Sequence, residues 1–346
     1  MSDKKIISIE EQLLIDLLFG RTELKKKNFN NINYENLVKI SSSHLMLPSL
    51  YINLKEKKLL KYVPMELKNY LREIYTINKE RNEILIEEVN IISKILITNN
   101  INHVFLKGAA HIICKIYIDI GQRMIGDIDI LIDKNQCKRA IKLLNLNGYK
   151  PIEGNYFFLN ESKHYIRQCK KNKIFAIEIH KKLLSKKNSE KFNIDEFLTK
   201  RMKVNGIYTP SINDQLKHNI YNYQINDYGN TKLSYSYRSL YDTYVLTKRT
   251  TEYQKEIKLD NYINNYFMIA EELKIPKLNL FTLTNIAANT YRFKLKLSNK
   301  LYYKIDSFII NQIIQLKFRP KQIIELIINK KYRKHIIKKV KGIINL

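Results

Sequence analysis

The sequence has few cysteines, no long apolar run, and no linker rich in glycine, serine or proline. Its three cysteines, Cys114, Cys137 and Cys169, form neither a Cys-x-x-Cys pair nor a zinc-binding pattern. A disulfide framework and a structural zinc site are therefore not expected. No apolar run reaches the roughly 18 residues of a membrane span, and the N-terminus lacks the features of a signal peptide. These absences predict a cytoplasmic protein.

Several common catalytic motifs are missing as well. The segment GQRMIGD spaces its glycines like the start of a P-loop, but Asp127 stands where the lysine and hydroxyl residue should begin, which excludes a Walker A site. No GxGxxG follows a predicted strand, and neither GxSxG nor HExxH occurs. A catalytic site in this chain would therefore have to be formed by residues outside these motifs.

Acidic residues are scarce relative to basic ones. The chain of 346 residues carries 61 lysines and arginines against 33 acids, which gives a formal net charge of +28. Such a field favours polyanionic partners, including RNA, DNA and nucleotides. The abundance of lysine, isoleucine, asparagine and tyrosine is also typical of AT-rich coding sequences, so the charge alone does not decide for a nucleic-acid partner.

The order of patterns predicts three regions: a helical lead-in over residues 1–99, an α/β core over 100–190, and a helical domain over 191–346. In the core, INHVFLKG and DIDILI read as strands, each followed by a helical period. The segments NYFFLNES, HYIRQCKK and KIFAIEIH read as further strands separated by polar turns. From about Asp195 onward the helical period persists to the end. The fold class is therefore α+β.

Three carboxylate residues are placed among the apolar residues of these strands. Side chains alternate between the two faces of a strand, so Asp127 and Asp129 share one face while Ile128 and Ile130 point to the other. Glu178 is likewise an acid inserted among apolar strand residues. Like charges this close are unfavourable unless a cation lies between them. If the strands are neighbours, the three acids predict a site for two divalent ions, Mg²⁺ or Mn²⁺, that serves phosphoryl or nucleotidyl transfer.

Nearby cations suit a phosphate-bearing substrate. Lys107 and Gly108 fall between a strand and a helix, where a glycine lets backbone amides approach phosphate oxygens and the lysine can pair with a triphosphate. Arg123, just before the aspartates, is a second candidate because its planar guanidinium suits bidentate phosphate contacts. His180 shares the face of Glu178, and either contacts the nucleotide or serves as a structural hydrogen-bond partner.

The arrangement FLKGAAH, RMIGDIDILID and AIEIHKKL resembles the DNA polymerase β nucleotidyltransferase superfamily, specifically a bacterial branch described as uncharacterised nucleotidyltransferase-like proteins. The resemblance implies a small mixed sheet with flanking helices, with Asp127 and Asp129 as the D-x-D pair and Glu178 as the third acid. Lys107 and Gly108 then replace the usual Gly-Ser turn. The segments EEQLLIDLL, SSSHLMLPSLY and YRSLYDTYVL also look like that branch, so the resemblance covers roughly residues 9–250.

The sequence thus favours a metal-dependent enzyme that moves a nucleoside monophosphate from an NTP to an acceptor. RNA is the preferred acceptor, with a tRNA end among the candidates. A protein or small-molecule acceptor remains an alternative, as does an inactive module that binds nucleic acid or a partner. A D-x-D glycosyltransferase would explain neither Glu178 nor the Lys107-Gly108 pair.

Two further patterns have competing interpretations. Asp242 lies four residues after Arg238, which predicts an i,i+4 ion pair on a helix, although Asp242 could instead order a groove near the acceptor. The basic tail over residues 318–346 spaces its isoleucines as a helix does. It could bind an anionic membrane, follow a phosphate backbone, or pack on the body of the protein, and packing is the favoured interpretation.

Overall fold

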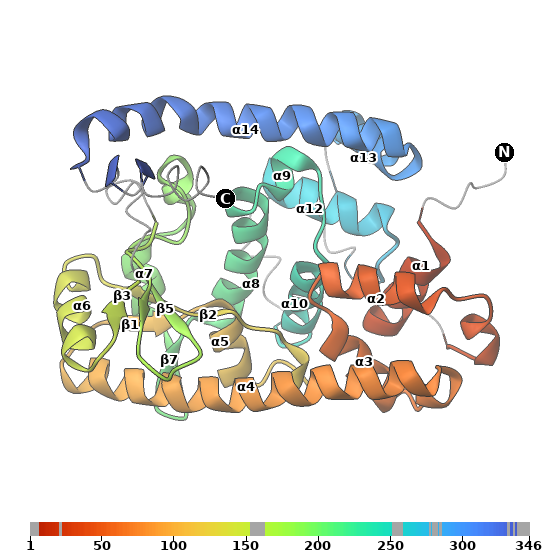
Figure 1. Ribbon diagram of the computed structural model, residues 1–346, viewed down its shortest axis with the longest axis horizontal. Helices are drawn as coiled ribbons and strands as arrows, with labels where there is room; N and C mark the ends of the chain where they lie inside the picture. The colour runs from red at the N-terminus through yellow and green to blue at the C-terminus, as the bar shows by residue number, and fades with distance from the viewer. Residues whose placement is uncertain are drawn as a thin grey trace.

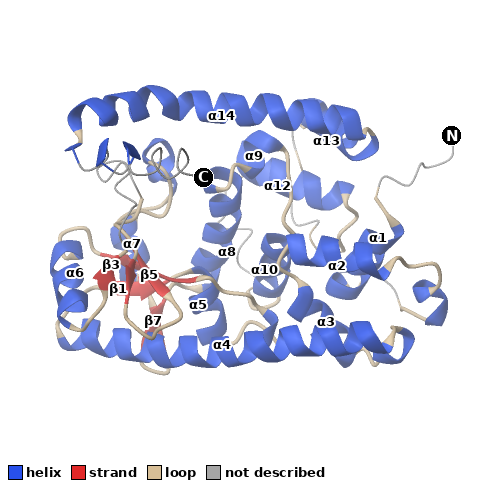
Figure 2. Cartoon of the chain, viewed as in Figure 1, coloured by secondary structure: helices blue, strands red, loops and turns tan. Residues whose placement is uncertain are grey.

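The computed structural model describes residues 7–20, 23–152, 163–250, 259–276, 278, 283, 286–330, 333–334 and 336–337. Within these ranges the chain is mostly helical, and its strands gather toward one end of the molecule (Figure 2). This confirms the predicted α+β class, with a small mixed sheet and flanking helices. The predicted strand NYFFLNES, residues 155–162, lies outside the described residues.

The N-terminal region is helical, as predicted. Its first helix begins after Ser8, whose hydroxyl accepts a hydrogen bond from the Glu11 amide at 3.1 Å, and it ends at Gly20 in the left-handed conformation, φ 65°. The described elements are α1 (Ile9–Phe19), η1 (Lys26–Phe29), α2 (Tyr34–Ser43), α3 (Leu47–Glu56), η2 (Leu60–Tyr62) and α4 (Met65–Thr98).

The five-stranded sheet has the order β1-β2-β5-β4-β3. Strand β2 pairs antiparallel with β1 and parallel with β5, whereas β4 runs antiparallel to both β5 and β3. The elements of this region are β1 (His103–Phe105), α5 (Lys107–Ile113), η3 (Ile120–Gln122), β2 (Asp127–Ile132), α6 (Cys137–Leu146), β3 (Lys150–Pro151), β4 (Gln168–Cys169) and β5 (Ala176–His180). The predicted strand HYIRQCKK is therefore shorter than expected.

Helix α4 supports both the sheet and the loop before β2. Its Leu85, Val89, Ile92 and Leu96 recur at three and four residues and join the apolar cluster beneath the sheet. In Figure 1 this long helix runs from beneath the sheet to α3, with which it packs. Asn82 lies on the same helix, about one turn before Leu85. Its Nδ2 donates hydrogen bonds to the carbonyls of Ile120 and Arg123 at 2.6 and 2.8 Å. Because α4 fixes this loop, it also fixes where β2 begins.

In the described residues after the sheet, the regular structure is helical except for one hairpin. The expectation of uninterrupted helix from Asp195 is wrong at β6 (Met202–Val204) and β7 (Ile207–Thr209), which form an antiparallel pair. Asn205 and Gly206 both have positive φ, 49° and 82°, as a two-residue hairpin turn requires. The other elements are η4 (Lys186–Lys191), α7 (Ile194–Thr199), α8 (Ile212–Tyr221), η5 (Asn222–Asn226), α9 (Gly229–Lys232), α10 (Tyr237–Thr247), α12 (Asn261–Glu272), α13 (Ala287–Ser298) and α14 (Lys300–Ile328).

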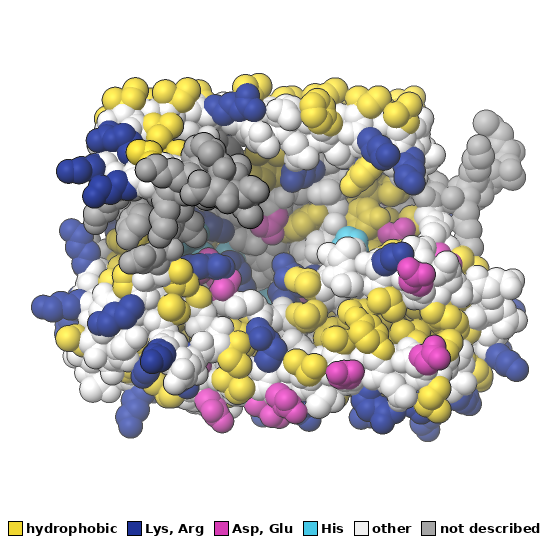
Figure 3. Space-filling model, viewed as in Figure 1, with side chains coloured by type: hydrophobic (Ala, Val, Ile, Leu, Met, Phe, Trp, Pro, Cys, Tyr) yellow, Lys and Arg dark blue, Asp and Glu magenta, His cyan; other side chains and the backbone are white. Residues whose placement is uncertain are grey.

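Helix α14 lies along the edge opposite α4 and packs against α13 and α9 (Figure 1). A band of hydrophobic side chains follows its outer edge (Figure 3). The exposed members include Leu301, Ile305, Phe308, Ile309, Ile313, Leu316, Ile323, Ile324, Ile327 and Ile328. In its described part, the tail thus exposes apolar side chains that the packing interpretation would bury. No helix among the described residues is long and apolar enough to cross a membrane.

Candidate functional site

The predicted acids meet where β2 and β5 pair in parallel. The register sets Asp129 directly opposite Glu178 and Asp127 opposite Ala176. On the other face of the same strands, Ile128, Ile130, Ile177 and Ile179 are fully buried in the cluster against α4 and α6. As the sequence pattern indicates, the alternation of faces packs the isoleucines into the core and turns the three acids toward one face.

An arginine that the sequence reasoning did not select links two of these acids. Arg167, just before β4, donates from Nε to Oε1 of Glu178 at 2.6 Å, and its Nη2 donates to Oδ2 of Asp127 in a very short contact. Its guanidinium is a cation already placed between Asp127 and Glu178. The signal that could have identified it is a lone arginine on a strand predicted beside β5.

Lys107 and His180 both approach the remaining acid, Asp129. The Lys107 ammonium lies 2.6 Å from Oδ1 of Asp129, and Nε2 of His180 lies 2.7 Å from the same oxygen. Burial works to raise the pKa of Asp129, but the charge of Lys107 and the hydrogen bond with His180 outweigh it and hold that pKa below its ordinary value. Asp129 therefore stays ionised at neutral pH.

The pKa values of the other two acids shift in opposite directions. Burial opposes ionisation of Glu178 as well, yet hydrogen bonds with His180 and Arg167 lower its pKa to about 2. For Asp127 burial prevails, and its pKa is raised despite the charge of Arg167. The site thus combines two firmly ionised carboxylates with a third that is more basic.

One subset of these residues has the geometry of a metal site. Asp129, Glu178 and His180 each offer a ligand atom, and the three atoms lie within 4.8 Å of one another. Carboxylate oxygens and an imidazole nitrogen suit a divalent cation such as Mn²⁺, and the carboxylates suit Mg²⁺. The donor set fits the expected ion, with His180 joining the acids, while Asp127 lies outside this set and contacts Arg167.

The backbone at the strand-to-helix turn is unusual. Lys107 adopts φ 51°, a left-handed conformation that costs a residue with a side chain about 1 kcal/mol or more. The next residue is a glycine for steric reasons, since a Cβ on Gly108 would lie 2.8 Å from Cγ1 of Ile125. This turn sets the Lys107 side chain against Asp129.

The Arg123 guanidinium pairs with the buried carboxylate of Asp242. Its Nε and Nη2 donate to Oδ1 and Oδ2 of Asp242 at 2.9 and 2.8 Å, and its Nη1 donates to the carbonyl of Met124. The hydroxyl of Tyr117 also donates to Asp242. Among the described residues Asp242 forms no ion pair with Arg238, so the i,i+4 pair is replaced by a link between α10 and the loop before β2.

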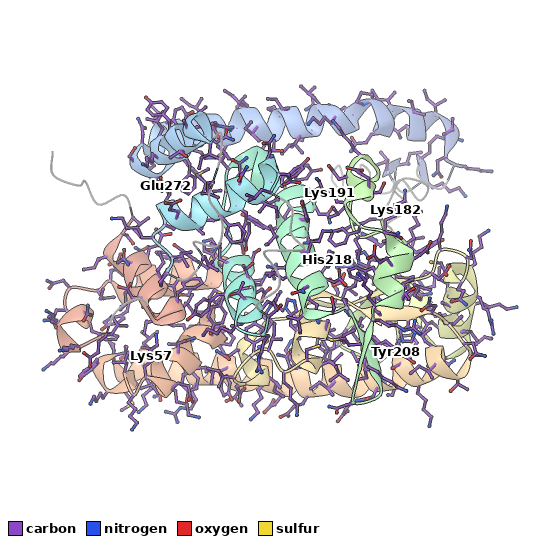
Figure 4. All side chains as sticks on the ribbon, turned by 180° about the vertical axis from the view of Figure 1, so that it is seen from behind. Lys57, Lys182, Lys191, Tyr208, His218 and Glu272 are labelled. Carbon is purple, nitrogen blue, oxygen red and sulfur yellow. The ribbon has the colours of Figure 1, made fainter. Side chains whose placement is uncertain are left out.

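A pocket opens beside these groups, between the sheet region and the C-terminal helices. Lys107, His111 and Arg123 line it from one side, and side chains of α8 and α10, among them His218 and Arg238, line it from the other. Its empty volume is about 670 Å³, which includes solvent at its open mouth. Figure 4 shows His218 on α8 near the centre of the molecule.

Comparison with known protein families gives one match. A family described as uncharacterised nucleotidyltransferase matches residues 30–277, well over half of the chain. The match contains every element that contributes to the acid cluster and to the pocket. No curated protein matches the chain.

Proposed function

Because the chain belongs to the uncharacterised nucleotidyltransferase family, we propose that it transfers a nucleoside monophosphate from an NTP to an acceptor and releases pyrophosphate. The observation that supports this best is the in-register pairing of Asp129 with Glu178 on parallel strands, with His180 beside both. Three donors on one rigid sheet suit a reaction that depends on alignment and charge neutralisation more than on covalent chemistry.

In the proposed reaction, an acceptor oxygen bonds to the α-phosphorus while the bond from that phosphorus to the β-bridging oxygen breaks. The proton of the acceptor hydroxyl passes to a carboxylate of the site or to water. A divalent cation, Mg²⁺ or Mn²⁺, bound by Asp129, Glu178 and His180 would neutralise phosphate charge and lower the pKa of the acceptor hydroxyl. A second ion bound by Asp127 would compete with the Arg167 guanidinium for that carboxylate.

The side chains around the acids have separate roles in this proposal. Asp127, Asp129 and Glu178 form the catalytic centre, and Lys107 pairs with the phosphates of the bound NTP. Arg123 supports the site through Asp242, since three of its nitrogens already have partners. RNA is the proposed acceptor because a net charge of +28 attracts a phosphate backbone.

Nucleotides labelled at the α-phosphate test the proposal. Each NTP would be incubated with the full chain and Mg²⁺ or Mn²⁺, in the presence of total RNA, of cell protein, or of small metabolites. Label in RNA together with pyrophosphate release is the expected result, while label in protein or metabolite would redirect the acceptor. A parallel reaction with γ-label separates this activity from phosphoryl transfer. No α-label in any acceptor, with RNA still bound in a salt-sensitive manner, would instead indicate a binding module.

Replacing Lys107 should weaken the use of the nucleotide. We expect Lys107→Met to lower kcat/KM for the NTP about tenfold or more, which corresponds to about 1.4 kcal/mol, because an ammonium beside the phosphates is lost. Lys107→Arg keeps the charge and should recover part of this loss. Equal kcat/KM for the wild-type protein and Lys107→Met would remove Lys107 from the phosphate site.

A further inference from the structure

Arg238 lines the pocket and forms no ion pair with any described residue. It belongs to the first turn of α10, its side chain is half-buried, and it lines the pocket together with Lys107. Throughout the described part of the chain, no carboxylate lies within ion-pair distance of its guanidinium and no hydrogen-bond acceptor contacts it. Burial lowers its pKa, which reflects the loss of water around the charged group. A guanidinium removed from water usually has an anionic partner.

Two acids, Asp242 and Asp227, act on the charge of Arg238 without pairing with it directly. Asp242, one turn along the same helix, accepts hydrogen bonds from Arg123 and Tyr117. Asp227 lines the same pocket and its charge acts on Arg238, but within the described part of the chain the two side chains form no ion pair. The partner of Arg238 is therefore expected to come from outside the chain.

The surroundings of Arg238 favour an anion that extends from the acid cluster. Lys107 is shared by the acid cluster and the pocket. Its ammonium contacts Asp129 at 2.6 Å, and Lys107 also lines the pocket. Lys163 adds a second desolvated cation, whose pKa is lowered by burial and by the nearby charge of Lys107. A chain of phosphates with its α-phosphate at the acids would thus pass Lys107 and enter a pocket where Arg238 can make bidentate contacts.

We propose that Arg238 binds the β- and γ-phosphates of the NTP, in the role that the sequence alone suggests for Arg123. The inference rests on the proposed function for the identity of the anion. The pairing of Arg123 with Asp242 has a second consequence in this view, because it keeps the Asp242 carboxylate from forming an ion pair with Arg238 and holds α10 against the loop before β2. Arg238 is thus a substrate-binding residue, and Asp242 is a positioning residue.

Binding of tripolyphosphate, measured by calorimetry in EDTA, tests this proposal without metal and without turnover. The wild-type chain should bind it saturably, and Arg238→Gln should weaken binding about tenfold or more, as expected for a lost charge-assisted hydrogen bond. Arg238→Lys should recover part of the affinity. The matched control is Arg72→Gln, which removes one positive charge from an exposed site on α4 and should leave binding unchanged.

Comparison of ATP with AMP identifies which phosphates Arg238 contacts. Arg238→Gln should weaken ATP binding but not AMP binding, because AMP lacks the β- and γ-phosphates. Unchanged tripolyphosphate binding in a folded Arg238→Gln variant would overturn the proposal, as would equal losses for ATP and AMP. These binding results do not depend on catalysis. If tripolyphosphate binding depends on Arg238 but no acceptor is ever labelled, the anion site is supported and the proposed transferase function is contradicted.

Discussion

Asp129→Asn is expected to reduce nucleotidyl transfer about 10³-fold or more, because the amide removes a charge that the metal site requires. A bound divalent ion contributes several kcal/mol to reactions of this type, and each 1.36 kcal/mol corresponds to a factor of ten. Asp129 has two partners, Lys107 and His180, which both contact its Oδ1, whereas Asp127 pairs with Arg167. Its loss should therefore disturb the donor set more than the loss of Asp127 alone.

The measurement is α-label transfer at saturating NTP, with circular dichroism to show that the variant is folded. Asp127→Asn combined with Asp129→Asn should abolish transfer. The control is Asp195→Asn, which removes an exposed acid from the first turn of α7 and should transfer at the wild-type rate. If Asp129→Asn retains more than about a tenth of the wild-type rate, the acid cluster is not the catalytic centre.

The second large effect concerns stability. We expect Asp242→Asn to lower the free energy of unfolding by about 3 kcal/mol or more at pH 7, because it leaves the Arg123 charge buried without its partner. The side chains are 2% and 11% exposed, so solvent provides little compensation. Urea unfolding measures the change, and Arg123→Met combined with Asp242→Asn should recover part of it, since both charges are then absent.

The pH dependence of this effect has a definite sign. Burial opposes ionisation of Asp242, but Arg123 and His111 hold its pKa below the ordinary value near 4. A carboxylate whose pKa is depressed in the folded state contributes stability above its unfolded pKa and loses it as the pH falls through the folded pKa. The difference in the free energy of unfolding between wild type and Asp242→Asn should thus have its full value at pH 7 and become smaller below about pH 4. A small, pH-independent difference would contradict the buried pair.

Much of the acid cluster could be predicted from the sequence because it depends on a local rule. Alternation along a strand places Asp127 and Asp129 on one face whatever surrounds them, and it sorts Glu178 from its isoleucine neighbours in the same way. The family resemblance supplied the rest, namely that the two strands adjoin. Their parallel pairing and exact register are then properties of the folded sheet.

The partners of the charged side chains could not be predicted because they depend on distant contacts. Spacing on a helix suggests that Arg238 pairs with Asp242, yet Arg123 reaches Asp242 from a loop 119 residues away in sequence and satisfies both of its oxygens. Arg167 contacts an acid 40 residues earlier in the chain. The hairpin at Asn205-Gly206 is different: it was missed because helix was expected from Asp195 onward, although an Asn-Gly dipeptide between apolar residues is a strong local hairpin signal.

Titration with Mn²⁺, followed by the electron paramagnetic resonance signal of the free ion, tests most directly whether acids from β2 and β5 together hold a divalent cation. The wild-type chain should show a saturable site. Asp129→Asn and Glu178→Gln should each weaken it about tenfold or more, since each removes a charged ligand, whereas Asp195→Asn should bind as the wild type does. Identical Mn²⁺ affinity in all four proteins would contradict a shared metal site on these strands.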